Sequence, residues 1–192
     1  LLNIGEKVFK IDSFLEKVNA ENPELVDYRV LAVKKAYFGE ISLEDTFFDS
    51  FREDYLYPPF DSWFNKKSDE VAYTCLLNDK LSAFLYIKTE EAGEAYQDIN
   101  PPFEKKKRLK IGTFKVTSNG FKIGERFLKI IFDNALVQQV EEIYVTIFDK
   151  RPEQLRLISL LEDWGFKYHG VKSTKNGVEQ VFIRGFSRLL GV

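Results

Sequence analysis

The stretch KVTSNGFKIGER, Lys115–Arg126, joins a predicted strand to a predicted apolar helix. Its glycines, Gly120 and Gly124, allow the backbone to approach a ligand closely. The first turn of a helix presents unpaired amides and the positive end of the helix dipole, so it binds phosphate without a cationic side chain. A tight turn with close packing of helix on sheet would also place glycines here. On these residues alone, we favour that structural role.

The junction lies within an alternating series of strands and helices. Apolar runs on both sides of it are short and nearly continuous, as expected of strands that are covered on both faces. The predicted elements are strands Leu109–Val116 and Ile143–Phe148, helices Ile123–Val137 and 152–165, and hairpins at 71–87 and 166–183. This order predicts a mixed α/β fold, with a central mixed sheet of about six to seven strands flanked by helices.

The first 70 residues have a different, helical and aromatic character. The predicted elements are a strand at Val8–Ile11 and helices at Ser13–Ala20, Pro23–Gly39 and from Asp45 onward. The last of these helices has an aromatic side chain at every fourth position, which is typical of a buried helix face. We expect a single domain, 1–192, with a helical region at 1–70 and a hairpin plus core at 71–184.

From Val71 to Arg184 the order of elements resembles that of the GNAT superfamily of acetyltransferases. The family's cofactor loop, Arg/Gln-x-x-Gly-x-Gly/Ala, falls on Asn119, Lys122 and Gly124, and only the last glycine matches. The Gly165-Phe166 step that ends the second helix is a recurrent family feature. The resemblance implies an acyl-CoA N-acyltransferase fold in which the region 1–70 lies on the acceptor side.

The resemblance also implies a binding mode for acetyl-CoA. The strand Leu109–Val116 would splay from Ile143–Phe148, and its free backbone groups would pair with the pantetheine arm. Loop amides would hold the pyrophosphate, and Gln154 falls at the position of a family asparagine. The implied cofactor-binding residues are Phe114, Lys115, Val116, Asn119, Gly120, Phe121, Lys122, Ile123, Gly124, Glu125, Arg126 and Gln154.

Catalytic residues are harder to place. In much of the family a tyrosine four residues before the closing Gly-Phe protonates the leaving thiolate, and that position is Leu161 here, which we expect to face the cofactor. Tyr144 or Tyr168 is an alternative proton donor, although a packing role is favoured for both. The base is open. An acidic, aromatic wall would suit a cationic amine, and the acids before the first hairpin are Glu40, Glu44, Asp45 and Asp49.

Composition excludes several classes of function. The 192 residues include one cysteine, Cys75, and one histidine, His169, so neither an internal disulfide nor a multi-histidine metal site is expected. No apolar run approaches the roughly 20 residues of a membrane span, and we expect a cytoplasmic protein that binds no membrane. A net charge of −2 argues against nucleic-acid binding, so the basic run Lys105–Arg108 is interpreted as a solvated strand entrance.

The first hypothesis is therefore an N-acyltransferase that transfers an acetyl group from acetyl-CoA to an amine by direct attack, without metal or covalent enzyme intermediate. The second is a catalytically silent acyl-CoA-binding or interaction module of a longer protein. Two features favour the second: the missing methionine start and the missing family tyrosine. A nucleic-acid role is third. The amine acceptor and the oligomeric state are open.

Overall fold

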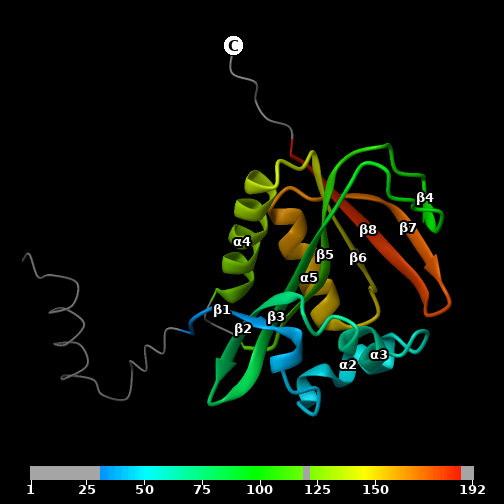
Figure 1. Cartoon of the computed structure of the whole chain (residues 1–192). Coiled ribbons are helices and arrows are strands. Elements are labelled where there is room, and N and C mark those ends of the chain that lie inside the picture. The colour runs from blue at the N-terminus through cyan, green and yellow to red at the C-terminus, as the bar shows by residue number, and fades with distance from the viewer. Residues whose placement is uncertain (1–30, 119–121, 187–192) are drawn as a thin grey trace, which may run out of the picture. The chain divides into compact units, whose positions relative to one another are not determined.

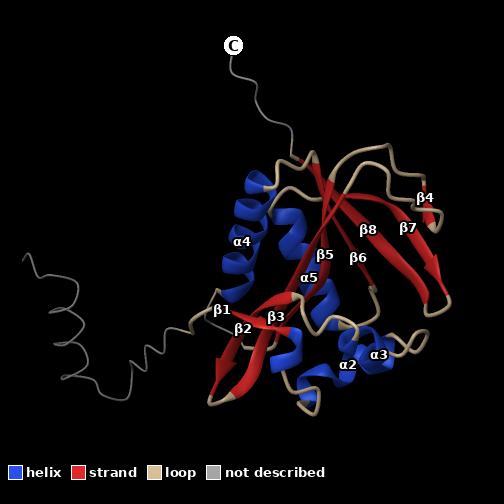
Figure 2. Ribbon diagram, viewed as in Figure 1, coloured by secondary structure: helices blue, strands red, loops and turns tan. Residues whose placement is uncertain are grey.

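The computed structural model describes residues 31–118 and 122–186, which form one mixed sheet of eight strands with helices on its faces (Figures 1 and 2). The strands are β1 (Lys34–Tyr37), β2 (Val71–Leu77), β3 (Lys80–Glu90), β4 (Ile99–Asn100), β5 (Arg108–Val116), β6 (Glu142–Ile147), β7 (Lys167–Thr174) and β8 (Gly177–Gly185). The helices are α2 (Asp49–Asp54), α3 (Phe60–Asn65), α4 (Ile123–Val137) and α5 (Pro152–Asp163), with 3-10 turns η2 (Phe38–Glu40) and η3 (Thr46–Phe48).

The strand order is β1-β2-β3-β5-β6-β8-β7-β4, and only the β5–β6 pair is parallel among the described pairs. The mixed α/β class with a flanked central sheet is confirmed. The sheet has more strands than expected because the short strands β1 and β4 pair with β2 and β7 at its two edges.

The region before the first hairpin differs from the expected long helices. Lys34–Tyr37 pairs with β2 as an edge strand, so the helix predicted over Pro23–Gly39 is wrong for these residues. Local helix propensity is a weak preference that tertiary pairing overrides. Asp45 does act as a cap, but it begins η3, and α2 is a separate short helix. The elements predicted at Val8–Ile11 and Ser13–Ala20 lie outside the described residues.

Two hydrophobic clusters lie on opposite faces of the sheet. Alternate residues of a strand point to opposite faces, and in β3 Leu85 belongs to the cluster under α4 and α5, whereas Phe84 belongs to a second cluster. The first cluster contains Phe127 and Leu128 of α4. The second is almost wholly aromatic and is formed by η2, η3, α2 and α3 against β3. The turns and helices between β1 and β2 are thereby held to one sheet face.

The feature that positions the site is the divergence of β5 from β6, which is visible in Figure 1. Their parallel pairing covers only Arg108–Ile111 against Glu142–Val145. Beyond that point β5 continues along β3 and β6 continues along β8. The backbone of Gly112–Val116 therefore has one side without a paired strand among the described residues.

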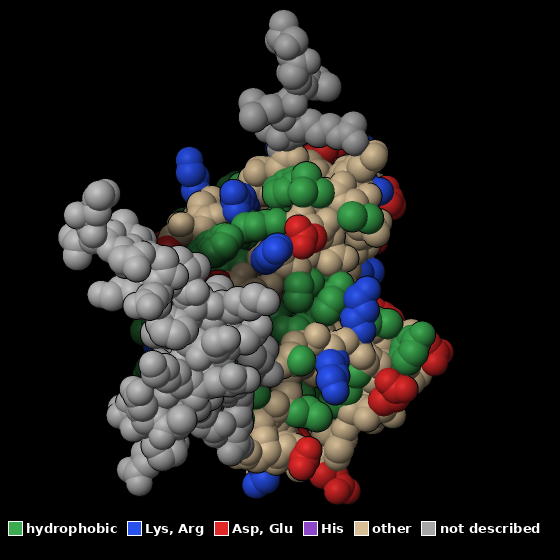
Figure 3. Space-filling model, turned by 90° about the vertical axis from the view of Figure 1, so that its left-hand side faces the viewer, with side chains coloured by type: hydrophobic (Ala, Val, Ile, Leu, Met, Phe, Trp, Pro, Cys, Tyr) green, Lys and Arg blue, Asp and Glu red, His purple; other side chains and the backbone are tan. Residues whose placement is uncertain are grey.

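The prediction that the basic run Lys105–Arg108 is solvated is wrong for its last residue. The Arg108 side chain is 1% exposed, and its Nε donates a hydrogen bond to Glu142 Oε1 at 2.7 Å. Its guanidinium lies 4.2 Å from the centroid of the Phe103 ring. On the face shown in Figure 3, basic and acidic side chains are interspersed among the described residues and do not gather in one basic patch.

Candidate active site

A cavity of about 820 Å³ lies where β5 and β6 diverge. Its lining includes residues 112–118 from β5 and the segment after it, 145–148 from β6 and the segment after it, and Gly124 of α4. Residues of α2, α3, β3, β7 and β8 complete the wall on the face that carries the aromatic cluster. The cavity thus connects the unpaired edge of β5 with a charged region on the sheet face.

The β5 side of the cavity has unsatisfied polar groups. The hydroxyl of Ser118 is buried and has no hydrogen-bond partner among the described residues. Buried polar groups in folded proteins are nearly always paired, so an unpaired hydroxyl on a cavity wall indicates a place where a ligand or water binds. The free backbone edge of Gly112–Val116 ends two residues before it.

Five of the predicted cofactor-binding residues line the cavity: Phe114, Lys115, Val116, Gly124 and Gln154. Lys115 Nζ donates to Phe47 O and, at 2.7 Å, to Ser50 Oγ, so this side chain ties β5 to the helical region. Gln154 Oε1 accepts from the Lys150 and Arg151 amides at 3.0 Å each. Both side chains therefore have protein partners before any ligand binds.

The other predicted cofactor-binding residues are elsewhere. Lys122 caps α4 with a left-handed backbone (φ 52°), and its side chain is exposed, as are Glu125 and Arg126. Arg126 Nη1 donates to Leu31 O at 2.7 Å. Ile123 is buried in the hydrophobic cluster under α4. None of these four side chains lines the cavity, and the remaining three predictions, Asn119, Gly120 and Phe121, lie outside the described residues.

Leu161 does not face the cavity as the resemblance led us to expect. It is fully buried in the hydrophobic cluster between α5 and the sheet, and its neighbour Leu160 lines the cavity. Adjacent helix positions are about 100° apart, so a shift of one residue moves a side chain from cavity to core.

Leu161→Tyr is therefore expected to lower the free energy of unfolding by about 1–3 kcal/mol, the usual cost of overpacking a core. Chemical denaturation of Leu161→Tyr beside Leu160→Tyr checks this, since Leu160 is only partly buried and points its side chain at open volume. A Leu161→Tyr protein as stable as the parent would show that position 161 has room for the ring.

The two tyrosines predicted as proton donors occupy other surroundings. The Tyr144 hydroxyl donates to Glu90 Oε2 at 2.7 Å, and burial together with this hydrogen bond raises its pKa. Tyr144 lies in a smaller hollow of about 170 Å³. Tyr168 is 57% exposed and packs on Phe182 with ring centroids 5.9 Å apart. Neither side chain lines the large cavity, so the structure offers no support for a catalytic role.

The acids named before the first hairpin also serve the local fold. Glu40 accepts from the Tyr37 amide at 2.9 Å, Asp45 accepts from the amides of residues 47 and 81, and Asp49 pairs with Arg52 at 2.8 Å. Glu44 is exposed. None of the four lines the cavity.

Different carboxylates line the cavity, and the sequence reasoning missed them. Asp54 Oδ2 accepts from Arg151 Nη1 at 2.8 Å and from Gln154 Nε2 at 2.9 Å. Burial raises the pKa of Asp54, and the charge of Arg151 opposes this effect. Glu90 Oε2 accepts from the hydroxyls of Tyr144 and Tyr96. Both acids are thus already engaged.

Glu179 on β8 differs from these two acids. It is 3% exposed, it lines the cavity, and its carboxylate forms no hydrogen bond or ion pair with any residue in 31–118 or 122–186. Burial and then the charge of Glu179 raise the pKa of the Tyr55 hydroxyl, which lines the same cavity. One signal in the sequence could have found this residue. Glu179, Val181 and Ile183 alternate along one face of the strand, and Glu179 is the single acid on this otherwise apolar face.

No protein-family model and no curated protein sequence matches the chain. Solved structures match it in fold. Arabidopsis thaliana Naa50 in complex with the bisubstrate analogue CoA-Ac-MVNAL is 15% identical over 81% of this chain and 100% of that chain, with a TM-score of 0.52. A Bacillus cereus IAA acetyltransferase is 10% identical over 81% and 99%, with a TM-score of 0.54.

A GNAT family acetyltransferase from Elizabethkingia anophelis with acetyl-CoA bound is 8% identical over 82% of this chain and 99% of that chain, with a TM-score of 0.54. These similarities show that the chain has the GNAT acyl-CoA N-acyltransferase fold. In the part of the chain that the structure describes, every helix is too short or too polar to cross a membrane.

Proposed function

With the GNAT fold as the premise, we propose that the chain is an N-acyltransferase that transfers an acetyl group from acetyl-CoA to an amine acceptor by direct attack. The observation that carries this proposal is one cavity with two complementary parts. At one side β5 presents an unpaired backbone edge, and at the other a buried carboxylate, Glu179, has no partner among the described residues.

The β5 side suits the cosubstrate. The free N–H and C=O groups of Gly112–Val116 would pair with an amide-bearing pantetheine arm in the manner of an added strand. The buried Ser118 hydroxyl and the adjoining first turn of α4 would serve the phosphate groups, since helix N-termini attract anions. Acetyl-CoA supplies an acetyl group activated as a thioester.

The Glu179 side suits the amine. An amine attacks only in its neutral form, and Glu179 would accept the proton that it loses as it is acylated, directly or through one water. A thiol with a pKa of about 8.5 can leave as thiolate near neutral pH, so a tyrosine at position 161 is helpful and not obligatory. Within the cavity the Glu179 carboxylate has no hydrogen-bonding partner among the described residues, so it is available to a substrate.

The test combines calorimetric titration of acetyl-CoA and CoA with an assay of thiol release in the presence of a panel of amines. We expect binding of both ligands and amine-dependent release of CoA. Binding without release under any amine would favour the silent acyl-CoA-binding module. Absence of binding at millimolar ligand would overturn both candidate functions.

A further inference from the structure

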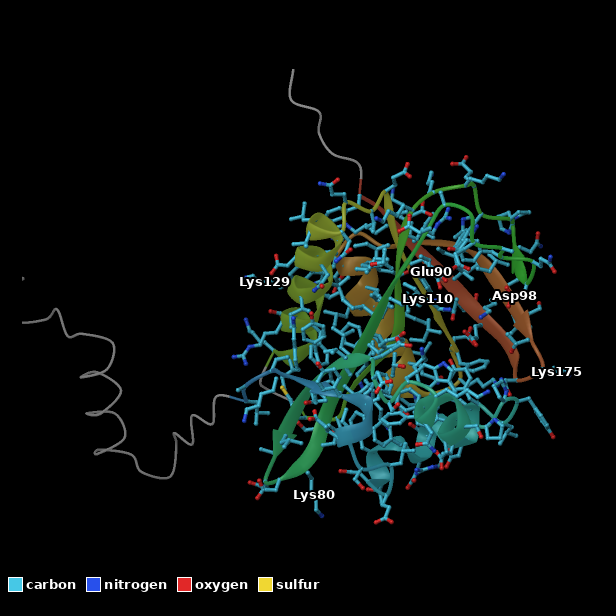
Figure 4. All side chains as sticks on the ribbon, in the orientation of Figure 1. Lys80, Glu90, Asp98, Lys110, Lys129 and Lys175 are labelled. Atoms are coloured by element: carbon cyan, nitrogen blue, oxygen red, sulfur yellow. The ribbon has the colours of Figure 1, made fainter. Side chains whose placement is uncertain are left out.

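A row of five charged side chains crosses the sheet face on which the cavity opens. Lys88 and Glu90 lie on β3, Lys110 on β5, Glu179 on β8 and Lys172 on β7, and all five line the cavity. Lys88 is the strand partner of Lys110, and Lys172 is the strand partner of Glu179. Figure 4 shows Glu90 and Lys110 close together at the centre of this face.

Lys110 makes only a long ion pair within the described part of the protein. Its Nζ is 3.8 Å from Glu90 Oε1, which is longer than a hydrogen bond, and it donates no hydrogen bond to any described residue. The side chain is 29% exposed, and its Nζ lies 5.8 Å from the centroid of the Tyr144 ring. Burial and then the positive charge of Lys172 lower the pKa of Lys110. An ammonium in this position would gain from an anion.

Lys110 and Glu179 are thus two opposite charges in one cavity, and neither has a hydrogen-bonding partner among the described residues. They are not paired with each other, since no N···O distance between them is within the 4 Å of an ion pair. Lys172 contacts Asp98 at 3.6 Å, and Lys88 has no ion pair with the described residues. Glu179 has no ion pair among the described residues, and Lys110 has only a long one to Glu90, so the cavity can accept a ligand that carries both complementary charges.

We infer that the acceptor is a small zwitterion, whose amine meets Glu179 and whose carboxylate or phosphate group is bound by Lys110 with Lys88 and Lys172. This inference rests on the proposed function and adds the class of acceptor to it. Either acceptor carries an amine and an anionic group in one small molecule. The test distinguishes a carboxylate from a phosphate as the anionic group.

The test measures acetyl-CoA-dependent thiol release with acceptors in matched pairs. One pair is L-alanine and L-alaninamide, and the other is glucosamine 6-phosphate and glucosamine. We expect the anionic member of at least one pair to have a kcat/KM about 10- to 100-fold higher than its neutral partner, the value of one charge-assisted hydrogen bond. The pair that shows the preference identifies the anion.

In Lys110→Met the ratio of kcat/KM between the anionic and the neutral member should fall close to one. Lys110→Arg should retain part of the preference for the anionic member. Lys80→Met is the matched control, because Lys80 is an exposed lysine at the far end of β3 and does not line the cavity (Figure 4). A preference for the neutral members, or an equal loss with both members in Lys110→Met, would overturn the inference while leaving acetyl transfer intact. If no amine at all releases thiol, the proposed function itself has failed, and the inference fails with it.

Discussion

Glu179→Gln is expected to lower kcat of acetyl transfer by about 100-fold or more, the usual contribution of a positioned general base. The amide keeps the shape of the side chain but does not accept the proton of the attacking amine. Because the carboxylate has no partner among the described residues, its neutralisation should leave the free energy of unfolding unchanged or raise it slightly. Steady-state kinetics and chemical denaturation of the same preparation check both statements.

The pH profile separates this role from a structural one. More of the amine acceptor is neutral as the pH rises toward the pKa of its amine, so less help from a base is needed. The defect of Glu179→Gln should therefore shrink toward alkaline pH. Glu153→Gln is the control, since Glu153 is an exposed acid on the cavity wall, and its kcat should change less than about fivefold. Equal kcat in Glu179→Gln and the parent at neutral pH would contradict the assignment.

The unit from β5 to α5 could be predicted from the sequence because its signals are local. Its strands are short apolar runs, α4 is apolar on most of its surface, and Gly165 ends α5 where the pattern predicted. The predicted residues Phe114, Lys115 and Val116 all line the cavity because they are consecutive at the end of one strand, β5. The error at Leu161 is a displacement of one helix position, which periodicity does not resolve.

The acceptor side could not be predicted because it is assembled from distant segments. Asp54 is bound by Arg151 and Gln154, about a hundred positions later in the chain, and Glu90 is bound by Tyr144. Glu179 reaches the cavity only through the pairing of β8 with β6 and β7. Strand β1 could not be predicted for the same reason. Its four residues form an edge strand because they pair with β2, and not because of their own sequence pattern.

Gly124→Asp is expected to abolish binding of CoA while the chain remains folded. A Cβ atom added to Gly124 would lie 2.8 Å from Leu160 Cδ2, the end of a flexible side chain that can move, and would meet no other atom within 4 Å apart from its chain neighbours and its own helix. Leu160 lines the cavity, so its displacement and the new side chain both reduce the space for the ligand. The added carboxylate also repels phosphate.

The cost to folding should be small, because an acid in the first turn of a helix is favoured by the helix dipole and most residues are better helix formers than glycine. Calorimetry of CoA binding is compared with chemical denaturation. Lys122→Ala is the control at an exposed position, and it should weaken binding only by the value of one charge-assisted contact, about 1.5–3 kcal/mol. Marked unfolding of Gly124→Asp with unaltered CoA affinity in the folded fraction would show that Gly124 packs the helix and does not border the ligand.

The fate of the acetyl group tests the proposed acetyl transfer most directly. The chain is incubated with acetyl-CoA labelled with ¹³C in the acetyl group and with each amine of the panel, and the products are identified by mass spectrometry. We expect a labelled N-acetyl amide and one free CoA for each amide formed, with both lost together in Glu179→Gln. Labelled acetyl groups that remain on CoA with every amine, or that appear only as acetate, would contradict the proposed transfer.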